Sequence, residues 1–463
     1  MGTDRFTSTR GLLASAAERA IRYLEQLPSR RVAPTPRALA GLAALDSALP
    51  EAPAEPREVL ELLDNAASPA TMAMAGPRFF GFVIGGSLPA ALAANWLAGA
   101  WDQNSALFNV TQATAVLEAV SLRWILGLLG LPPSCAGAFV TGATMANFTA
   151  LAAARNAVLS KAGWNVEAQG LFGAPPITVI VGEEAHPTLF KSIGLLGLGR
   201  SRLTRVPVDA QGRLRPNALP RLSGPTIHCL QAGNVNTGAF DPIGEICSRV
   251  RGEARGDNLW VHVDGAFGLW AAAAPGRAHL TAGLQLADSW ATDAHKWLNV
   301  PYDSGLALVK DAQALKASMA ITAEYLPTES PNRNPSDYTP ELSRRARGVE
   351  IWAALRTLGR SGLVDLLERT CRYASRFAEG LAAAGHRVLN QVELNQVLVA
   401  FGTPEATRRV IAGLQEEGTC WCGETVWQGQ TAMRISVCSW ATTETDVERS
   451  LEAMIRVAAS GAR

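Results

Sequence analysis

The chain has 463 residues, of which 48% are hydrophobic and 18% charged, a composition typical of a globular protein with a large core and no long disordered part. Its net charge of +1 and its scattered basic residues argue against binding to nucleic acid or to an acidic membrane. The length exceeds that of a usual single domain, so we expect one large domain with smaller terminal parts that act on a small molecule.

Helical apolar spacing dominates the first part of the chain. Residues 11–27 and 57–66 carry apolar stripes without a sheet of their own, within a segment, residues 1–75, that prolines punctuate. The following apolar stretches, 79–101 and 124–154, are long enough to cross a bilayer but contain several glycines and prolines. We therefore expect buried loops and helices there and no membrane span.

Short β-rich runs alternate with helix-length segments through the middle of the chain. This alternation predicts a mostly parallel sheet covered by helices on both faces, in a large domain of residues 76–345. The expected strands are residues 138–140, 177–181, 226–230, 259–264, 289–292 and 306–309. Helices over residues 348–358, 363–384 and 445–458, with weaker strands between them, predict a small C-terminal α/β domain over residues 346–463.

A lysine and an aspartate stand at the ends of two of these strands. Lys296 follows the strand 289–292 in the sequence Asp-Ala-His-Lys-Trp, and Asp264 ends the strand 259–264 in His-Val-Asp-Gly-Ala. Ligands of such sheets bind beyond the carboxyl ends of the strands. Lysine can bind the aldehyde of pyridoxal 5'-phosphate, and aspartate can keep the pyridine nitrogen protonated. The pair therefore predicts pyridoxal phosphate chemistry.

Three further motifs fall at the same edge. Residues 141–147 place small side chains and the Thr144 hydroxyl at a strand-to-helix turn, where backbone N–H groups and the helix dipole favour a phosphate. His186 follows the strand 177–181, where an imidazole can stack on a pyridine ring. A polar, glycine-containing turn over residues 233–241 follows the strand 226–230.

These motifs, in this order, resemble those of the pyridoxal-phosphate-dependent group II decarboxylases of fold type I, which include the aromatic-amino-acid, glutamate, histidine and diaminobutyrate decarboxylases. The resemblance extends from about Phe79 to the last helix. It implies that Lys296 is the Schiff-base lysine, Asp264 the partner of the pyridine nitrogen and His186 the stacking histidine. It also implies that Ala266 lies beneath the ring, while Ala143, Thr144 and His295 surround the phosphate.

The resemblance implies decarboxylation of an L-amino acid to an amine and carbon dioxide. A loop tyrosine commonly returns the proton to Cα in this family; Tyr338 is the preferred donor here and Tyr325 the second. Phe82, Asn104 and Arg434 are the expected substrate-binding residues, with Asn104 supplied by a second subunit. Aldehyde-forming oxidative decarboxylation–deamination, a carbon–carbon lyase reaction and transamination remain alternatives, and the substrate stays open.

One departure concerns the phosphate. Asp293 stands where many relatives have asparagine, and a carboxylate beside a phosphate is unfavourable, so we expect Asp293 to turn away. The resemblance further implies an intertwined homodimer with shared active sites, embraced by residues 1–75. Seven dispersed cysteines without a CxxC pair or metal-ligand spacing predict reduced thiols, no metal site and a cytoplasmic protein, and no secretion signal is visible.

Overall fold

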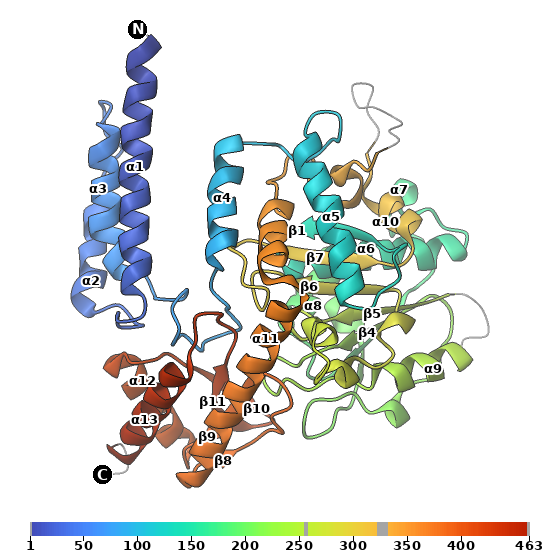
Figure 1. Ribbon diagram of the computed structural model, residues 1–463. Coiled ribbons are helices and arrows are strands. Elements are labelled where there is room, and N and C mark those ends of the chain that lie inside the picture. Colours follow the sequence, from blue (N-terminus) through green and yellow to red (C-terminus); the bar gives the residue numbers. More distant parts are fainter. Residues whose placement is uncertain (1, 254–257, 322–331, 461–463) are drawn as a thin grey trace.

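The computed structural model describes residues 2–253, 258–321 and 332–460. Its N-terminal part is a group of helices that stands beside the rest of the molecule (Figure 1). The group contains α1 (Gly2–Gln26), α2 (Pro36–Gly41) and α3 (Pro56–Ala67). Proline occupies the first turn of α2 and of α3, where its missing N–H costs nothing and its fixed φ suits a helix. An ion pair of 2.8 Å between Arg19 and Asp64 joins α1 to α3.

A seven-stranded sheet forms the centre of the described structure, in the order β1-β7-β6-β5-β4-β2-β3. Six strands run in one direction, and β7 is antiparallel to both of its neighbours, β1 and β6. The prediction of a mostly parallel sheet is therefore confirmed, with one reversed strand. The strands are β1 (Ala136–Val140), β2 (Thr178–Gly182), β3 (Thr204–Val206), β4 (Thr226–Gln231), β5 (Leu259–Asp264), β6 (Ser289–Asp293) and β7 (Gly305–Val309).

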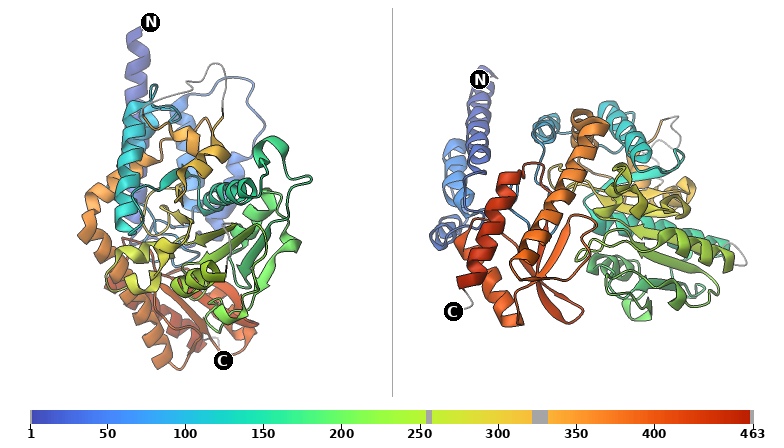
Figure 2. Two further views of the ribbon diagram at one scale, coloured as in Figure 1. Left: turned by 90° about the vertical axis from the view of Figure 1, so that its right-hand side faces the viewer. Right: turned by 60° about the horizontal axis from the view of Figure 1, so that its bottom comes forward.

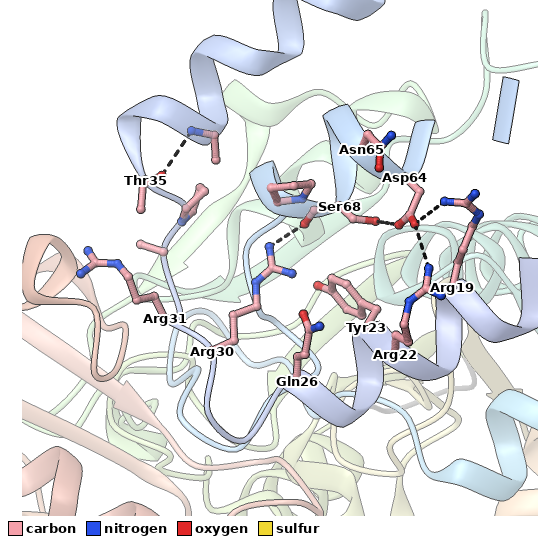
Figure 3. Close-up of a pocket in the computed structure, with 14 residues that line it drawn as sticks. Arg19, Arg22, Tyr23, Gln26, Arg30, Arg31, Thr35, Asp64, Asn65 and Ser68 are labelled. Carbon is pink, nitrogen blue, oxygen red and sulfur yellow. Dashed lines mark hydrogen bonds and ion pairs between the residues drawn. The ribbon is translucent and has the colours of Figure 1, made fainter. Parts of the chain in front are cut away.

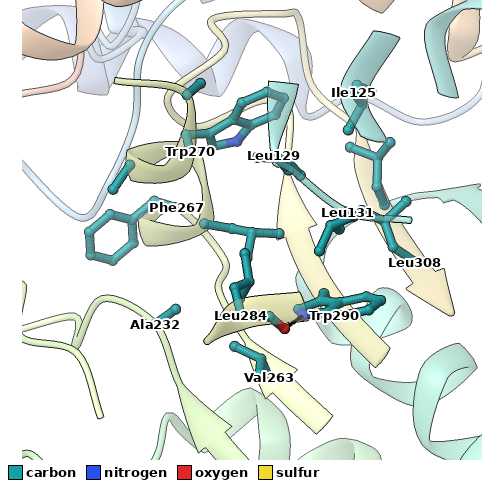
Figure 4. Close-up of a cluster of buried hydrophobic side chains, with 14 of the residues drawn as sticks. Ile125, Leu129, Leu131, Ala232, Val263, Phe267, Trp270, Leu284, Trp290 and Leu308 are labelled. Atoms are coloured by element: carbon teal, nitrogen blue, oxygen red, sulfur yellow. Dashed lines mark hydrogen bonds between the residues drawn. The ribbon is translucent and has the colours of Figure 1, made fainter. Parts of the chain in front are cut away.

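Helices cover both faces of this sheet (Figures 1 and 2). Alternate residues of β5 point to opposite faces, so Val261 and Val263 join one apolar cluster and Trp260 joins another. Figure 4 shows part of the first cluster, which includes Phe267, Trp270 and Trp290. The helices in this part of the chain are α4 (Pro89–Trp101), which packs on the later helix α11 and not on the sheet, α5 (Gln112–Leu128), α6 (Ala143–Lys161), α7 (Val166–Gln169), α8 (Pro187–Leu195), α9 (Ile243–Glu253) and α10 (Ala312–Met319).

The two uncharged stretches of the sequence become parts of this domain. The first forms a loop and helix α4, and the second contains the end of α5, strand β1 and most of α6. Among the described residues, no helix is both long and apolar enough to span a membrane.

The C-terminal part is built on a second, four-stranded sheet of order β10-β11-β9-β8. Its strands are β8 (Arg387–Val388), β9 (Gln396–Ala400), β10 (Gly423–Trp427) and β11 (Gln430–Ser436). The helices are α11 (Gly348–Ala383), α12 (Pro404–Glu417) and α13 (Glu444–Ser460). Gly359, with φ +58°, interrupts α11 near the break expected between residues 358 and 363.

Short 3₁₀ turns connect these elements. They are η1 (Leu42–Leu45), η2 (Ser68–Ala70), η3 (Arg200–Arg202), η4 (Pro216–Ala218), η5 (Gly268–Ala273), η6 (Ala278–Thr281), η7 (Leu284–Leu286) and η8 (Pro335–Tyr338). The last of them, η8, is held near the edge strand β1 by a buried ion-pair cluster. The carboxylate of Glu118 on α5 pairs with Arg333 at 2.8 Å and with Arg344 at 2.7 Å.

Candidate active site

The candidate site lies at the edge where β1, β2, β5 and β6 end. Asp264 is the last residue of β5, and Lys296 lies in the turn after β6, so adjacent parallel strands deliver them to one edge. Gly85 packs against this turn so closely that a Cβ there would collide with the Lys296 carbonyl oxygen. The chain from Gly85 to helix α4 therefore fixes the backbone that carries Lys296.

Asp264 is a buried carboxylate that accepts two hydrogen bonds. Asn147 Nδ2 donates to Oδ2 over 3.1 Å, and the Ala266 backbone N–H donates to Oδ1 over 3.3 Å. Burial raises the pKa of Asp264 to about 6, although the positive charge of Lys296 and these bonds oppose the shift. A cationic group placed beside this carboxylate would offset the cost of burying it.

A line of buried hydrogen bonds ends at Asp264, and it was not predicted from the sequence. Trp260 Nε1 donates to Ser289 Oγ over 2.8 Å, and Ser289 Oγ lies 2.9 Å from His262 Nδ1. His262 Nε2 lies 2.8 Å from Asn147 Oδ1. Because the Asn147 amide nitrogen donates to Asp264, the Asn147 oxygen accepts, and each of the three groups between Trp260 and Asp264 then donates one bond of the line and accepts another.

The same hydrogen bonds determine which ring nitrogen of His262 carries the proton. Burial lowers the pKa of His262 to about 3, so the ring is neutral and carries its proton on Nε2, toward Asn147. The Ser289 hydroxyl then donates to Nδ1. All four supporting side chains are buried, and together they hold the Asn147 amide pointing at Asp264.

Helix α6 begins at the same edge, directly after β1. Its first residues include Ala143 and Thr144, as the expected phosphate cradle requires. Gly305, at the start of β7, lies against Gly142, where any Cβ would meet the Gly142 backbone. The two glycines thus let the antiparallel strand pass close to the helix N-terminus.

The expectation that Asp293 turns away is wrong. Its Oδ1 accepts a 2.6 Å hydrogen bond from the Ala143 backbone N–H, and its Oδ2 lies 2.9 Å from Lys296 Nζ. The side chain is 2% exposed, and a buried carboxylate is stabilised only where a cation and N–H donors surround it. The N-terminus of α6 and Lys296 supply these partners, so the Asp293 side chain points toward them.

His295 and Tyr302 form a stacked pair beside these groups. Their ring centroids are 4.2 Å apart, and His295 Nδ1 accepts from the Ser304 backbone N–H over 3.0 Å. Burial is the main cause that lowers the pKa of His295 and that raises the pKa of Tyr302, so both are neutral near pH 7. Sequence reasoning missed Tyr302; its place six residues after Lys296 was the available signal.

His186 caps the N-terminus of α8, just beyond β2. Its Nδ1 accepts from the Thr188 backbone N–H over 3.3 Å and lies 2.7 Å from the Thr188 hydroxyl. Burial, followed by the charges of Lys296 and Arg434, lowers the pKa of His186 to about 4. The imidazole is therefore neutral, and its orientation is set by Thr188.

Arg434 and Phe82 line one hollow of about 480 Å³ between the N-terminal loop and the small domain. Arg434 Nη1 donates to the Val235 carbonyl oxygen over 3.3 Å, and burial lowers the pKa of Arg434. Phe82 is 59% exposed and stacks on Trp421 with the centroids 5.9 Å apart. The hollow thus combines an aromatic wall with a cation.

Two of the expected site residues, Asn104 and Tyr338, contact other parts of the chain. Asn104 Oδ1 accepts from the Arg344 backbone N–H over 2.9 Å, and the Tyr338 ring lies 4.5 Å from the Arg333 guanidinium. Within the described ranges, no hydrogen bond or ring contact joins Asn104 or Tyr338 to Lys296. Tyr325 lies outside the described residues.

The arrangement fits the expected cofactor. Lys296 supplies an amine, Asp264 a buried carboxylate whose raised pKa calls for a cationic partner, and His186 a neutral ring. Thr144 and the start of α6 supply donors for a phosphate. The exception is Asp293, whose carboxylate already accepts from the helix N-terminus.

Comparisons with known proteins agree with this geometry. A profile of the pyridoxal-dependent decarboxylase conserved domain matches residues 39–403. The chain is 28% identical over 327 residues to an aromatic-L-amino-acid decarboxylase of Bacillus atrophaeus, over 68% of this chain and 65% of that protein. It is 29% identical over 385 residues to an L-2,4-diaminobutyrate decarboxylase of Rhizobium meliloti (strain 1021), over 79% and 74% of the two chains.

Solved structures give the same result for the fold. Oryza sativa TDC, solved with PLP and tryptamine, has a TM-score of 0.90 and 23% sequence identity, over 99% of both chains. Mouse CSAD has a TM-score of 0.89 and 21% identity, over 97% of this chain and 98% of that one. At these identities the likeness shows that the fold is shared.

Proposed function

The chain belongs to the pyridoxal-dependent decarboxylase family, a family of carboxy-lyases, and we propose that it removes the α-carboxylate of an L-amino acid to give the amine and carbon dioxide. The observation that carries this proposal is the convergence of Lys296, Asp264 and His186 at one sheet edge. The cofactor is pyridoxal phosphate. When bound, it supplies an aldehyde that takes up amino groups and a ring that accepts the electron pair released at Cα.

The side chains of this chain would hold the cofactor in a fixed orientation. Lys296 would bind the aldehyde, and Asp264 would keep a proton on the ring nitrogen, steadied by Asn147. His186, neutral and fixed by Thr188, would stack on the ring above Ala266. The donors at the start of α6 and the His295 ring would face the phosphate.

The remaining side chains would orient the substrate. The guanidinium of Arg434 can pair with a carboxylate of the amino acid, and Phe82 offers an apolar face in the same hollow. Holding the α-carboxylate so that its bond to Cα stands perpendicular to the ring selects loss of carbon dioxide over the other possible reactions. The mixed character of the hollow does not name the amino acid.

We further propose a homodimer in which each active site takes residues from both subunits. Asn104 is exposed and Tyr338 is partly buried, and within the described ranges neither forms a hydrogen bond or ring contact with Lys296 of its own chain. The Ser336 backbone N–H donates to the Ala106 carbonyl oxygen over 3.1 Å, and Asn104 accepts from Arg344. Glu118 holds the segments around both residues through two arginines; burial alone would raise its pKa, but their charges lower it. Residues held in this way suit delivery to a partner's site.

The N-terminal helices support the same assembly. Figure 3 shows how Arg19, Arg22 and Asp64 tie α1 to α3 around an open pocket. Outside this polar seam the helices expose large apolar side chains, as expected of surfaces that pack on a partner. These are Leu13, Ile21 and Leu24 on α1 and Val59, Leu62 and Leu63 on α3.

The three-part division of the chain stays a proposal, with residues 1–75 as a dimerisation segment, 76–345 as the cofactor domain and 346–463 as the small domain. The separate four-stranded sheet supports the last boundary. A cytoplasmic location is also proposed. It is supported by the seven cysteines, all of them described, buried and free.

Tyr338→Phe should lower the rate of amine formation by about 10²-fold, because the phenol is the proposed proton donor to Cα. The matched control is Tyr302→Phe, which removes the phenol that stacks on His295 and should lower the rate by less than about tenfold. Amine and carbon dioxide are measured at saturating substrate. The reverse order of effects would transfer the donor role to Tyr302.

Mixed dimers test whether the donor acts across the subunit boundary. Lys296→Ala and Tyr338→Phe chains, each inactive or weak alone, are co-produced and the mixed dimer is isolated by two affinity tags. If Tyr338 serves the partner's site, one of the two sites in the mixed dimer is intact and activity returns to about half of the normal value. Absence of recovery would place the donor within its own subunit.

A substrate panel tests the reaction itself. Purified protein with added pyridoxal phosphate is incubated with each common L-amino acid and with 2,4-diaminobutyrate, and carbon dioxide, amine, aldehyde and peroxide are measured together. Carbon dioxide with an equal amount of one amine supports the proposal and identifies the substrate. Carbon dioxide with aldehyde and peroxide would replace it by oxidative decarboxylation–deamination.

A further inference from the structure

A carboxylate stands at the helix N-terminus that a phosphate would use. Asp293 Oδ1 accepts a short hydrogen bond of 2.6 Å from the Ala143 backbone N–H. Lys296 Nζ, 2.9 Å from the other oxygen, holds the carboxylate in that orientation. The neighbouring His295 lies 3.6 Å away but is neutral near pH 7, because burial lowers its pKa. Lys296 is thus the cation that balances Asp293.

We propose that Asp293 competes with the cofactor phosphate for the N-terminus of α6 and thereby sets a low affinity for the cofactor. The first N–H groups of a helix and its dipole are the main attraction for a phosphate where few cations surround it. Here the first of these groups, Ala143 N–H, is satisfied by a fixed anion of the protein itself.

The charge balance makes this competition costly. A phosphate at this helix end would bring a second anion, and the single Lys296 ammonium group cannot balance both. Asp293 is 2% exposed, so water does not screen its charge from a phosphate at the same helix end. Either the carboxylate or the phosphate must then give up part of the helix N-terminus, and binding is weakened in both cases.

Equilibrium binding of two ligands that differ only in the phosphate tests the proposal. Protein freed of cofactor by dialysis is titrated with pyridoxamine 5'-phosphate and with pyridoxamine; neither has an aldehyde, so neither reacts with Lys296. Asp293→Asn and Asp293→Ala should each increase the affinity for pyridoxamine 5'-phosphate by about tenfold or more. Each should change the affinity for pyridoxamine by less than about threefold. The alanine variant removes the charge without adding an amide donor.

The matched control is Asp288→Asn, which makes the same change at the other end of β6. Asp288 accepts from the Val261 backbone N–H over 2.8 Å and pairs with Arg251, far from the start of α6. Its affinity for the phosphate ester should stay within about twofold of the natural chain. Circular dichroism and thermal unfolding establish that each variant is folded.

Three results would overturn the proposal. Weaker or unchanged binding of the phosphate ester by both Asp293 variants would mean that the carboxylate does not compete. Equal tightening of pyridoxamine would place the effect on the ring rather than the phosphate. Tightening by asparagine alone would show that the new amide, and not the lost charge, is responsible. Because these are binding measurements, they hold whatever substrate or reaction the panel assay finds.

Discussion

Lys296→Ala should abolish turnover, lowering kcat by at least about 10³-fold, while the chain keeps its fold and assembly. Lys296 is the amine that the structure places at the ends of β5 and β6, next to Asp264. Without Lys296, the cofactor would have no covalent anchor, and the substrate amine would meet the free aldehyde instead of the more reactive lysine adduct. The measurement is carbon dioxide release from the substrate found in the panel.

The matched control is Lys310→Ala, at the end of the neighbouring strand β7. The Lys310 side chain is exposed, and its ammonium group lies 3.4 Å from the Gln285 carbonyl oxygen, so its removal should leave kcat within about twofold. Gel filtration and thermal unfolding should show that both variants are assembled and folded. Turnover retained by the Lys296 variant would contradict the proposed mechanism.

The sequence was informative where chemistry and topology coincide. The strands carrying Asp264 and preceding Lys296 could be predicted because each is a short apolar run that ends in a polar motif, and parallel strands end at one edge. The reversed direction of β7 was missed, although the short connection of residues 294–304, which has no room for a crossover helix, favours an antiparallel β7. It carries Gly305 up to the start of α6.

Side-chain directions were less predictable than strand ends. Repulsion from a phosphate predicts that Asp293 avoids the start of α6, but a buried carboxylate needs a cation and N–H donors, and for Asp293 this need decides the orientation. The supporting line from Trp260 through Ser289 and His262 joins residues 29 and 115 positions apart, so no local pattern could reveal it. Tyr338 likewise is placed by Arg333 and not by any motif around it.

Asp264→Asn should lower kcat by about 10²–10³-fold, because an amide cannot keep a positive charge on the ring nitrogen. The amide also disturbs the line of hydrogen bonds, since Asn147 Nδ2 and the Ala266 N–H both need an acceptor there. Ser289→Ala separates the two effects, because it breaks the line at a distance and leaves the carboxylate. It should lower kcat by less than about tenfold.

In the absence of cofactor, the Asp264→Asn variant should become more stable relative to the natural chain as the pH rises. Burial raises the pKa of Asp264 to about 6 from its ordinary value of 3.8, so between these values the folded chain holds a proton that the unfolded chain has lost. Stability of the natural chain therefore falls with rising pH in this window, by roughly 3 kcal/mol.

The asparagine of the variant does not titrate. The difference in unfolding free energy, variant minus natural chain, should grow between pH 4 and pH 7 by a similar amount, which urea unfolding at each pH measures. A difference independent of pH would mean that burial does not destabilise the Asp264 carboxylate. Bound pyridoxal phosphate should remove most of the pH dependence of stability, because it would place a cation beside this carboxylate.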